Sequence, residues 1–264
     1  MPSSPSGLFD LSGRDIWFFG GAGYLGQSCV AQTVAAGAKA LCVDLSDRAQ
    51  RFVAEQRLSE RVTAATLDVG QTDGIAAFVD AQVALRGVPD GLVVLTYGTS
   101  TKSLAMTTPA DFDLVNHLGI TATFTLASAV GQKMAEAGKP GSIVLFSSMY
   151  GTIAPDPGIY IAPQNPNNIA YGVGKAGIQQ MARYFSVYWG PKAIRCNSIA
   201  PGPFPFPSQL ADKPGFLQNL ADKNPLGRIG RPEEMAGPVL FLLSDASSYV
   251  TGHNLAVDGG WTAW

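Results

Sequence analysis

Short apolar runs separated by stretches of helical spacing are the feature that most constrains the fold of this chain. The runs lie at residues 15–20, 39–45, 62–69, 91–98, 141–148, 193–202 and 254–260. They lack clean alternation of apolar and polar residues, so they are predicted to be strands buried on both faces. Stretches between them, such as 24–38 and 109–138, place apolar residues at helical spacing. We therefore predict an α/β fold, a single domain over residues 1–264 with a doubly wound, mainly seven-stranded parallel sheet.

The composition narrows the class of protein. A chain of 264 residues, 46% hydrophobic, can bury a core without disulfide bridges. A net charge of −2 argues against a nucleic-acid partner. Three distant cysteines and two isolated histidines predict neither a disulfide framework nor a metal site. The start "MPSSPSGLFD" is unlike a signal peptide and no apolar run approaches about 18 residues, so we expect a cytoplasmic protein without a membrane span.

A glycine-rich stretch, "FFGGAGYLG", directly follows the first predicted strand and opens the first predicted helix. It places Gly20, Gly23 and Gly26 three residues apart, with Tyr24 and Leu25 between the last two. Glycine is needed where the backbone turns tightly and a pyrophosphate approaches it, and the helix N-terminus offers free N–H groups. The stretch predicts a dinucleotide site on a Rossmann fold, although a merely tight strand–helix turn would look similar.

Acidic residues follow the second and third runs. Asp44 lies 18 residues after the last loop glycine, where a carboxylate can accept from the ribose hydroxyls and repel a 2′-phosphate. NAD is therefore favoured over NADP; the neighbouring Leu45 adds no cation, whereas Arg48 is near enough to leave NADP open. Asp68, followed by Val69, stands where a carboxylate can accept from adenine N6, or it simply caps a helix.

Serine, tyrosine and lysine occur in order in the second half of the chain. "AYGVGK" places Tyr171 four residues before Lys175, on one face of a predicted helix. Ser147 and Ser148 end the fifth apolar run. A Tyr-x-x-x-Lys pair alone is common by chance, so its meaning depends on the motifs that precede it.

Together these motifs resemble the short-chain dehydrogenase/reductase family over essentially the whole chain, from the glycine loop to the terminal "VDGGW". The resemblance implies that Ser148, Tyr171, Lys175 and Asn116 are catalytic, and that the protein is a homotetramer or homodimer. It also implies contacts of the cofactor with Tyr171, Lys175, Thr96, Gly98, Pro201, Gly202 and Phe204.

The implied chemistry explains these residue types. Hydride passes between a secondary alcohol or ketone and the nicotinamide, while Tyr171 takes or gives the proton. An ordinary tyrosine has a pKa of about 10, and the nearby Lys175 cation and the oxidised nicotinamide would favour its phenolate. Ser148 would hold the reacting oxygen, and Asn116 would anchor a water that links Lys175 to solvent.

The sequence departs from the family pattern in four respects. Phe19 replaces the usual threonine before the first glycine, "LTYG" at 95–98 replaces "NNAG", and Phe206 replaces a threonine after the Pro-Gly pair. The gap between Ser148 and Tyr171 is also longer than is usual in the family. The cofactor contacts near Thr96 and Phe206 are put in doubt by these changes.

The long gap, "GTIAPDPGIYIAPQNPNN", joins the predicted catalytic serine and tyrosine, so it should border the substrate. We expect substrate contacts from Ser148 and Tyr171 together with residues of this loop. The loop candidates are Asp156, Tyr160, Gln164 and Asn165. Such polar residues favour a sugar, sugar acid or polyol, although the loop could equally serve subunit packing.

Three alternatives stay open. An NADPH-dependent ketoacyl or ketone reductase is disfavoured by Asp44. A non-catalytic dinucleotide sensor is disfavoured because Tyr171 and Lys175 are both present. A chiefly structural homo-oligomer would use small residues of the Tyr171 helix to pack against a partner subunit. Those residues are Gly172, Gly174, Ala176 and Gly177.

Overall fold

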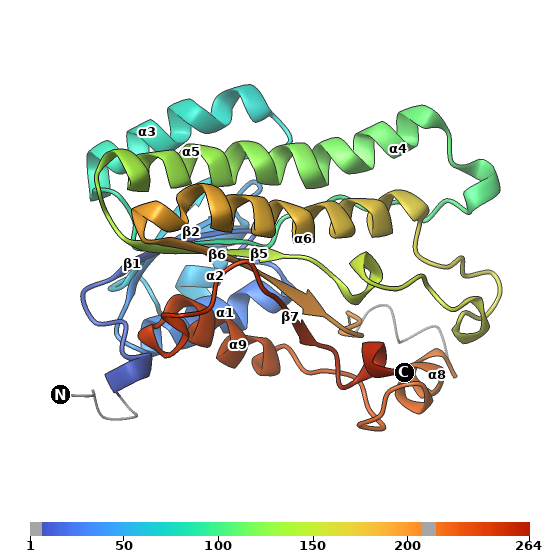
Figure 1. Cartoon of the computed structure of the whole chain (residues 1–264). Coiled ribbons are helices and arrows are strands. Elements are labelled where there is room, and N and C mark those ends of the chain that lie inside the picture. The colour runs from blue at the N-terminus through green and yellow to red at the C-terminus, as the bar shows by residue number, and fades with distance from the viewer. Residues whose placement is uncertain (1–6, 207–214) are drawn as a thin grey trace.

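A seven-stranded parallel sheet forms the centre of the molecule, as the sequence predicted (Figure 1). The computed structural model describes residues 7–206 and 215–264. The strand order is β3-β2-β1-β4-β5-β6-β7, and each neighbouring pair is parallel. The strands are β1 Asp15–Phe19, β2 Lys39–Asp44, β3 Val62–Thr66, β4 Gly91–Val94, β5 Gly141–Phe146, β6 Ile194–Pro201 and β7 Asn254–Val257.

The central strands are buried on both faces, which explains why their sequences do not alternate. In β1, Ile16 and Phe18 point into one apolar cluster, whereas Trp17 and Phe19 point into another. All four side chains are fully buried. Successive residues of a strand face opposite sides, so a strand inside two cores must be apolar throughout.

Helices cover both faces of the sheet (Figure 1). Buried residues of α1, α2 and α9 pack into the first cluster, and those of α3, α5 and α6 pack into the second. The helices are α1 Tyr24–Ala35, α2 Arg48–Glu55, α3 Ile75–Arg86, α4 Pro109–Asn116, α5 Ala122–Glu136, α6 Ile169–Trp189, α8 Phe216–Asp222 and α9 Glu233–Leu243.

The predicted long helix is one helical run of three parts. α4 begins at a capping box between Thr108 and Asp111, a π-helical segment spans His117–Thr121, and α5 continues to Glu136. The whole run Pro109–Glu136 is long and apolar enough to cross a membrane by length and composition, contrary to our expectation. Core helices of soluble proteins pass the same test, and this run packs against α3 and α6.

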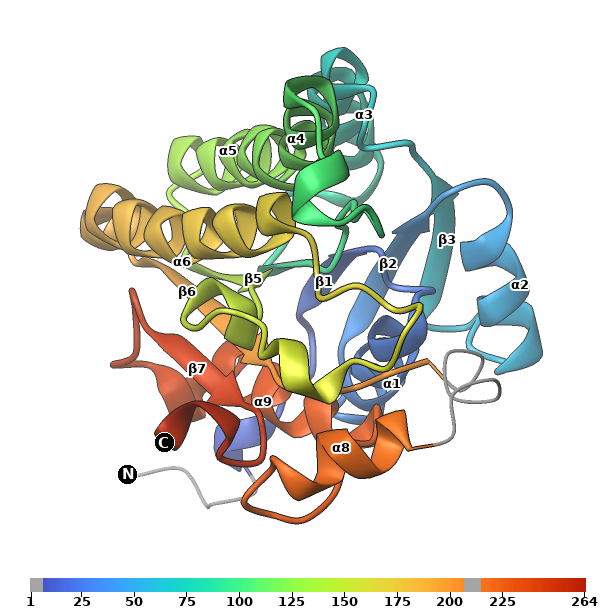
Figure 2. The ribbon, with the colours of Figure 1, turned by 90° about the vertical axis from the view of Figure 1, so that its right-hand side faces the viewer.

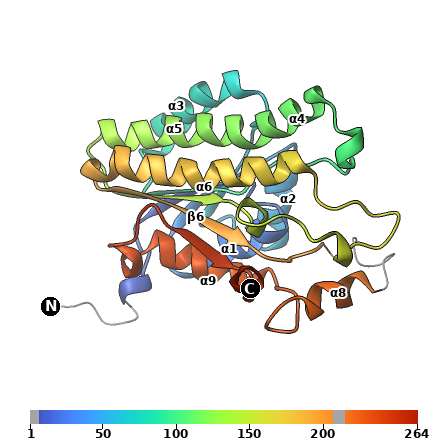
Figure 3. The ribbon, with the colours of Figure 1, turned by 45° about the vertical axis from the view of Figure 1, so that its right-hand side comes forward.

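The sheet order fixes where a ligand can bind. Chain order reverses between β1 and β4, which is the switch point where parallel sheets open a crevice at their carboxyl ends. The loop before α6 and the helix α8 both lie beyond these strand ends (Figures 2 and 3). The site predicted from the sequence therefore falls at this edge.

The small residues of α6 face their own chain more than solvent. A Cβ on Gly174 would overlap the hydroxyl of Tyr97, and one on Gly172 would lie 3.0 Å from a backbone oxygen. Gly177 packs near Ile120, and of the four small residues Ala176 is the exposed one. Gly174 is therefore taken up by its own chain, and packing of this helix against a partner subunit stays a prediction.

Candidate active site

A cavity of about 1320 Å³ opens at the carboxyl edge of the sheet. Its walls come from the segments that follow β1 to β6, from the loop before α6 and from α8. Single ligand pockets are usually about 300 to 1,000 Å³. The cavity therefore has room for a dinucleotide and a small substrate together.

The glycine loop forms one end of this cavity. Gly20 has φ of +81°, a conformation that favours glycine. A Cβ on Gly26 would lie 2.5 Å from the carbonyl oxygen of Gly20, so α1 can approach the loop only with glycine there. The N-cap of α1 is Gly23, and no side chain of the described residues caps it. The loop therefore leaves N–H groups at the helix start for an anionic group, which fits a pyrophosphate.

Asp44 lies beside this loop and is 6% exposed. Its carboxylate accepts from the backbone N–H of Ala22 at 3.0 Å and of Leu45 at 2.9 Å. Arg48 reaches the same carboxylate at 3.2 Å, and its side chain is 44% exposed. Both Asp44 and Arg48 line the cavity, so the expected acid is accompanied by a cation that the sequence argument could not place.

All the predicted cofactor-binding residues line the cavity. They are Gly20, Gly23, Tyr24, Leu25, Gly26, Asp44, Leu45, Asp68, Val69, Thr96, Gly98, Tyr171, Lys175, Pro201, Gly202 and Phe204. Asp68 also accepts from the N–H of Gly70 at 2.9 Å, which fixes the turn after β3. The hydroxyl of Thr96 is buried without a hydrogen-bond partner among the described residues.

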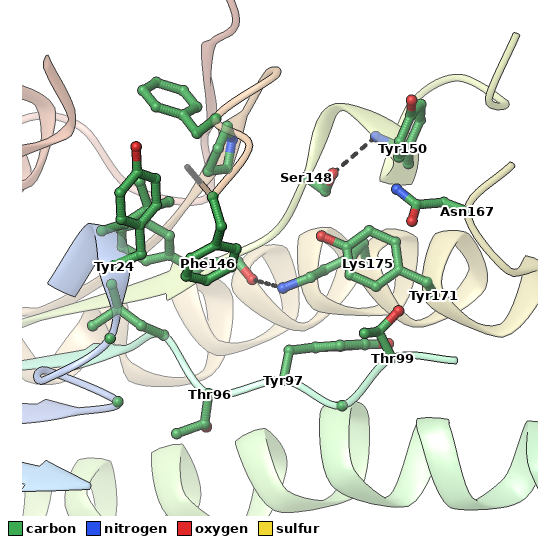
Figure 4. A pocket seen from close by; sticks show the side chains of 18 of the residues that line it. Tyr24, Thr96, Tyr97, Thr99, Phe146, Ser148, Tyr150, Asn167, Tyr171 and Lys175 are labelled. Atoms are coloured by element: carbon green, nitrogen blue, oxygen red, sulfur yellow. Dashed lines mark hydrogen bonds between the residues drawn. The ribbon is translucent and has the colours of Figure 1, made fainter. Parts of the chain in front are cut away.

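The structure distinguishes the two neighbouring serines. The hydroxyl of Ser147 donates to the carbonyl of Lys175 at 3.1 Å and accepts from Gln179 at 3.0 Å, so it ties β5 to α6. Ser148 lines the cavity, and its hydroxyl accepts from the N–H of Tyr150 at 3.2 Å (Figure 4). A hydrogen bond from Ser148 also acts on Tyr171, where it lowers the pKa of the phenol. The placement agrees with Ser148 as the serine that faces substrate.

Lys175 is almost completely buried, at 4% exposure. Its ammonium donates to the carbonyl oxygen of Phe146 at 2.7 Å, and burial lowers the pKa of Lys175 to about 7. Burial also raises the pKa of Tyr171, against the hydrogen bond from Ser148 and with a smaller contribution from Tyr160. In the protein alone the pKa of Tyr171 is therefore raised, whereas the expected lowering included the charge of the oxidised nicotinamide.

Asn116 lies apart from the cavity wall. Its amide donates to the carbonyl of Phe112 at 2.9 Å, while its Oδ1 atom is buried without a partner in the described part of the chain. It is the last residue of α4 before the π-helical segment. A Cβ on Gly174 would lie 3.0 Å from this Oδ1 atom, so Asn116 approaches the helix that carries Lys175.

The expected substrate residues divide into two groups. Ser148, Tyr160, Gln164, Asn165 and Tyr171 line the cavity. Asp156 does not belong to the described cavity wall. Its carboxylate accepts from the N–H of Gly158 and pairs with Lys223, directly after α8, at 2.5 Å. The proposed substrate contact of Asp156 is therefore replaced by a link between the loop and α8.

Sequence reasoning missed two tyrosines of the site. The Tyr150 hydroxyl lies 3.0 Å from that of Tyr160, and both side chains reach the cavity. Tyr97, the third residue of "LTYG", packs edge-to-face on Tyr171 with ring centroids 5.2 Å apart (Figure 4). The departure from "NNAG" was the available signal for Tyr97, but a sequence cannot show which way the new ring points.

Phe206 also takes a defined place. Its ring lies 4.8 Å from that of Tyr24, centroid to centroid, and both rings line the cavity. Phe206 stands where the family pattern has a threonine, and its ring contacts Tyr24 at the start of α1.

Comparison with known proteins finds relatives over nearly the whole chain. The family described as "Enoyl-(Acyl carrier protein) reductase" matches residues 21–262. A "Short chain dehydrogenases/reductase notP'" of Aspergillus versicolor is 32% identical over 99% of this chain and 91% of the relative. Galactitol 2-dehydrogenase (L-tagatose-forming) of Cereibacter sphaeroides is 31% identical over 97% of this chain and 98% of its own.

Solved structures show the same architecture with either dinucleotide. A gluconate 5-dehydrogenase of Burkholderia cenocepacia J2315, in complex with NADP and tartrate, has a TM-score of 0.89 at 26% identity and covers 99% of this chain and 100% of its own. A short chain dehydrogenase of Leptospira borgpetersenii with bound NAD+ has a TM-score of 0.84 at 29% identity, covering 99% of this chain and 97% of its own.

Proposed function

The chain belongs to the short-chain dehydrogenase/reductase family, and on that basis we propose that it oxidises a neutral polyol or sugar, or reduces the matching ketone, with a nicotinamide cofactor. One observation carries the proposal: Ser148, Tyr171 and Lys175 converge on one cavity that the glycine loop also lines. An oxidoreductase acting on CH–OH groups agrees with the relatives. The identity of the substrate and the preferred dinucleotide are our inference.

The residues divide the chemistry between them. The bound nicotinamide supplies the hydride acceptor or donor. Ser148 donates a hydrogen bond to the reacting oxygen and holds it beside the Tyr171 phenol, which takes the alcohol proton or returns it. Lys175 places a positive charge behind Tyr171, held by the carbonyl of Phe146. Because burial raises the pKa of Tyr171, its ionisation would need both the Lys175 charge and the positive charge that an oxidised cofactor would supply.

We propose that NAD is preferred over NADP. The support is Asp44, whose nearly buried carboxylate lines the cavity at the end of β2 and would repel a 2′-phosphate. Arg48 weakens the preference, because its guanidinium lies 3.2 Å from Asp44 and could turn to a phosphate instead. The structural relatives include proteins with NADP and with NAD+, so the protein itself must be tested with both.

A neutral substrate is favoured over a sugar acid. Among the described residues that line the cavity, Lys175 and Arg48 are the only cations, and Arg48 stands beside Asp44 at the end of β2. A carboxylate on the substrate would lack a cationic partner of its own. The wall near Ser148 instead offers hydroxyl and amide groups suited to neutral hydroxyls, namely Thr99, Tyr150, Tyr160, Gln164 and Asn167.

Absorbance at about 340 nm provides the test of this function. Polyols, sugars, sugar acids and simple secondary alcohols would be screened with NAD and with NADP in parallel. We expect turnover of a neutral polyol with NAD, and loss of about 10²- to 10⁴-fold in kcat for Tyr171→Phe with dinucleotide binding retained. Turnover with NADP alone would overturn the Asp44 argument, and an undiminished Tyr171→Phe variant would overturn the mechanism.

We further propose a cytoplasmic homo-oligomer, a tetramer or dimer. Three free, buried cysteines support a reducing compartment. Large apolar side chains exposed on α4, α5 and α6 support a subunit interface, since large exposed apolar areas mark sites of contact between proteins. They are Leu114, Phe124, Val173, Tyr184, Val187 and Tyr188.

A further inference from the structure

The Tyr97 ring lies between two glycines, Gly119 and Gly174, that come from separate helical segments. A Cβ on Gly119, in the π-helical segment, would overlap the Tyr97 ring. A Cβ on Gly174, in α6, would overlap the Tyr97 hydroxyl. Two glycines on separate helical segments thus make room for one side chain. The position of the Tyr97 ring therefore requires that both residues lack a side chain.

The ring touches both ionisable groups of the proposed mechanism. The Lys175 ammonium lies over the face of Tyr97, 4.1 Å from the ring centroid, and 5.5 Å from the centroid of Tyr171. The edge of one ring meets the other, with the Tyr97 and Tyr171 planes at 79°. Figure 4 shows Tyr97 below both side chains, on the segment that follows β4. The face of an aromatic ring attracts a cation, and most strongly where water is excluded.

We propose that Tyr97 is a positioning residue, whose ring stabilises the Lys175 ammonium and so keeps its charge available to Tyr171. The ring gives the buried ammonium a second favourable contact besides the carbonyl of Phe146. The inference rests on the proposed function, because a positioned lysine matters only if Tyr171 exchanges protons with substrate.

The hydroxyl of Tyr97 takes little part in this role. It is buried without a hydrogen-bond partner among the described residues, and burial raises the pKa of Tyr97, so the phenol stays protonated. The groups around Tyr171 that could titrate with it are Lys175 on its own helix, Tyr97 after β4, and Tyr150 and Tyr160 before α6. Of these, Lys175 is the cation.

Matched variants separate the ring from the hydroxyl. Tyr97→Phe keeps the ring, whereas Tyr97→Leu removes the ring and stays apolar, with Tyr97→Met as a second ringless variant if the first folds poorly. A cation over an aromatic face is worth a factor of about 2 to 30 in an equilibrium. The pKa of Lys175 can be measured from the carbon-13 chemical shift of its Cε atom as a function of pH. We expect this pKa to fall by about half a unit to one unit in the ringless variants and to stay unchanged in Tyr97→Phe.

Turnover supplies the second readout. The acidic limb of the pH dependence of kcat should move to higher pH in the ringless variants, by about the same half unit to one unit, because less Lys175 is charged and Tyr171 ionises later. Substrate KM should stay within about twofold. Unchanged Lys175 pKa values in the ringless variants, or equal changes in Tyr97→Phe, would overturn the inference. A changed Lys175 pKa in a protein without turnover would instead overturn the proposed function.

Discussion

Lys175, which is 4% exposed, makes a contribution to the free energy of unfolding that depends on pH. In the folded protein burial lowers the pKa of Lys175 to about 7 from 10.5. Between these values the unfolded chain binds more protons than the folded one, so the contribution of this group to stability rises with pH. Below pH 7 the lysine is charged in both states, and its destabilising effect is then largest and constant.

We therefore expect Lys175→Met to stabilise the cofactor-free protein most at low pH. The gain in free energy of unfolding over the wild type should exceed about 1 kcal/mol at pH 6.5, and it should shrink steadily towards pH 9. Urea denaturation of both proteins at several pH values measures this difference. A gap that does not change with pH would show that Lys175 titrates normally.

At the residue scale, the placement of a side chain could be predicted where the order of strands and helices along the chain decides it. Ser148, Tyr171 and Lys175 follow a strand or open a helix, so chain order alone brings them to one edge of the sheet. The pKa of Tyr171 did not follow, because burial, which no sequence displays, outweighs the hydrogen bond from Ser148.

At the scale of elements, the loop before α6 and the helix α8 form one wall of the cavity. Asn219 of α8 donates to the carbonyl of Ile159 at 3.1 Å, and the rings of Phe216 and Tyr160 lie 5.8 Å apart, centroid to centroid. The Asp156–Lys223 ion pair adds a third link between these segments. Tyr160 and Phe216 line the cavity, so a change that weakens the contact between the loop and α8 should also displace this part of the cavity wall.

Breaking the ion pair should affect substrate binding more than chemistry. Both partners are partly exposed, at 37% and 40%, and such pairs contribute about 0.2–1 kcal/mol. We expect Lys223→Met and Asp156→Asn each to raise the substrate KM by about 1.5- to 5-fold, with kcat and dinucleotide affinity unchanged, and the double variant to add little.

A matched control comes from α2. Arg51 and Asp47 form another exposed ion pair at 3.1 Å, so Arg51→Met should leave KM unchanged. A large loss of activity in Asp156→Asn with a normal Lys223→Met variant would contradict this view. It would return Asp156 to the role of a direct substrate contact that its sequence suggested.

Helices and strands could be predicted from the sequence where the spacing of apolar residues or a glycine at a turn defines them. Strands buried on both faces lack alternation, and the glycine loop marks the first strand–helix turn, so the sheet could be predicted. The loop before α6 could not, because its contacts run to α8, which begins at Phe216, some 47 positions after α6 begins at Ile169. Long-range ion pairs such as Asp156–Lys223 leave no local pattern in a sequence.

At the scale of the whole molecule, α6 exposes large apolar side chains on its outer side. α5 and α6 run side by side (Figures 1 and 3), and the outer side of α6 exposes Tyr184, Val187 and Tyr188 by 61–78%. The inner side of the same helix carries the buried Lys175. A second subunit packed on the outer side would steady the helix that holds the proposed catalytic pair.

We expect the wild-type protein to have a solution mass of two or four times 27.7 kDa. A Val187→Glu/Tyr188→Glu variant should have a smaller mass, because two charges would enter the proposed apolar interface. Light scattering after size-exclusion chromatography measures both masses. Leu85→Glu on α3, where leucine is 79% exposed, is the control and should keep the wild-type mass. A wild-type monomer, or an unchanged mass in the double variant, would show that this face is not the subunit interface. The activity of a dissociated but folded variant then measures how far α6 depends on its partner.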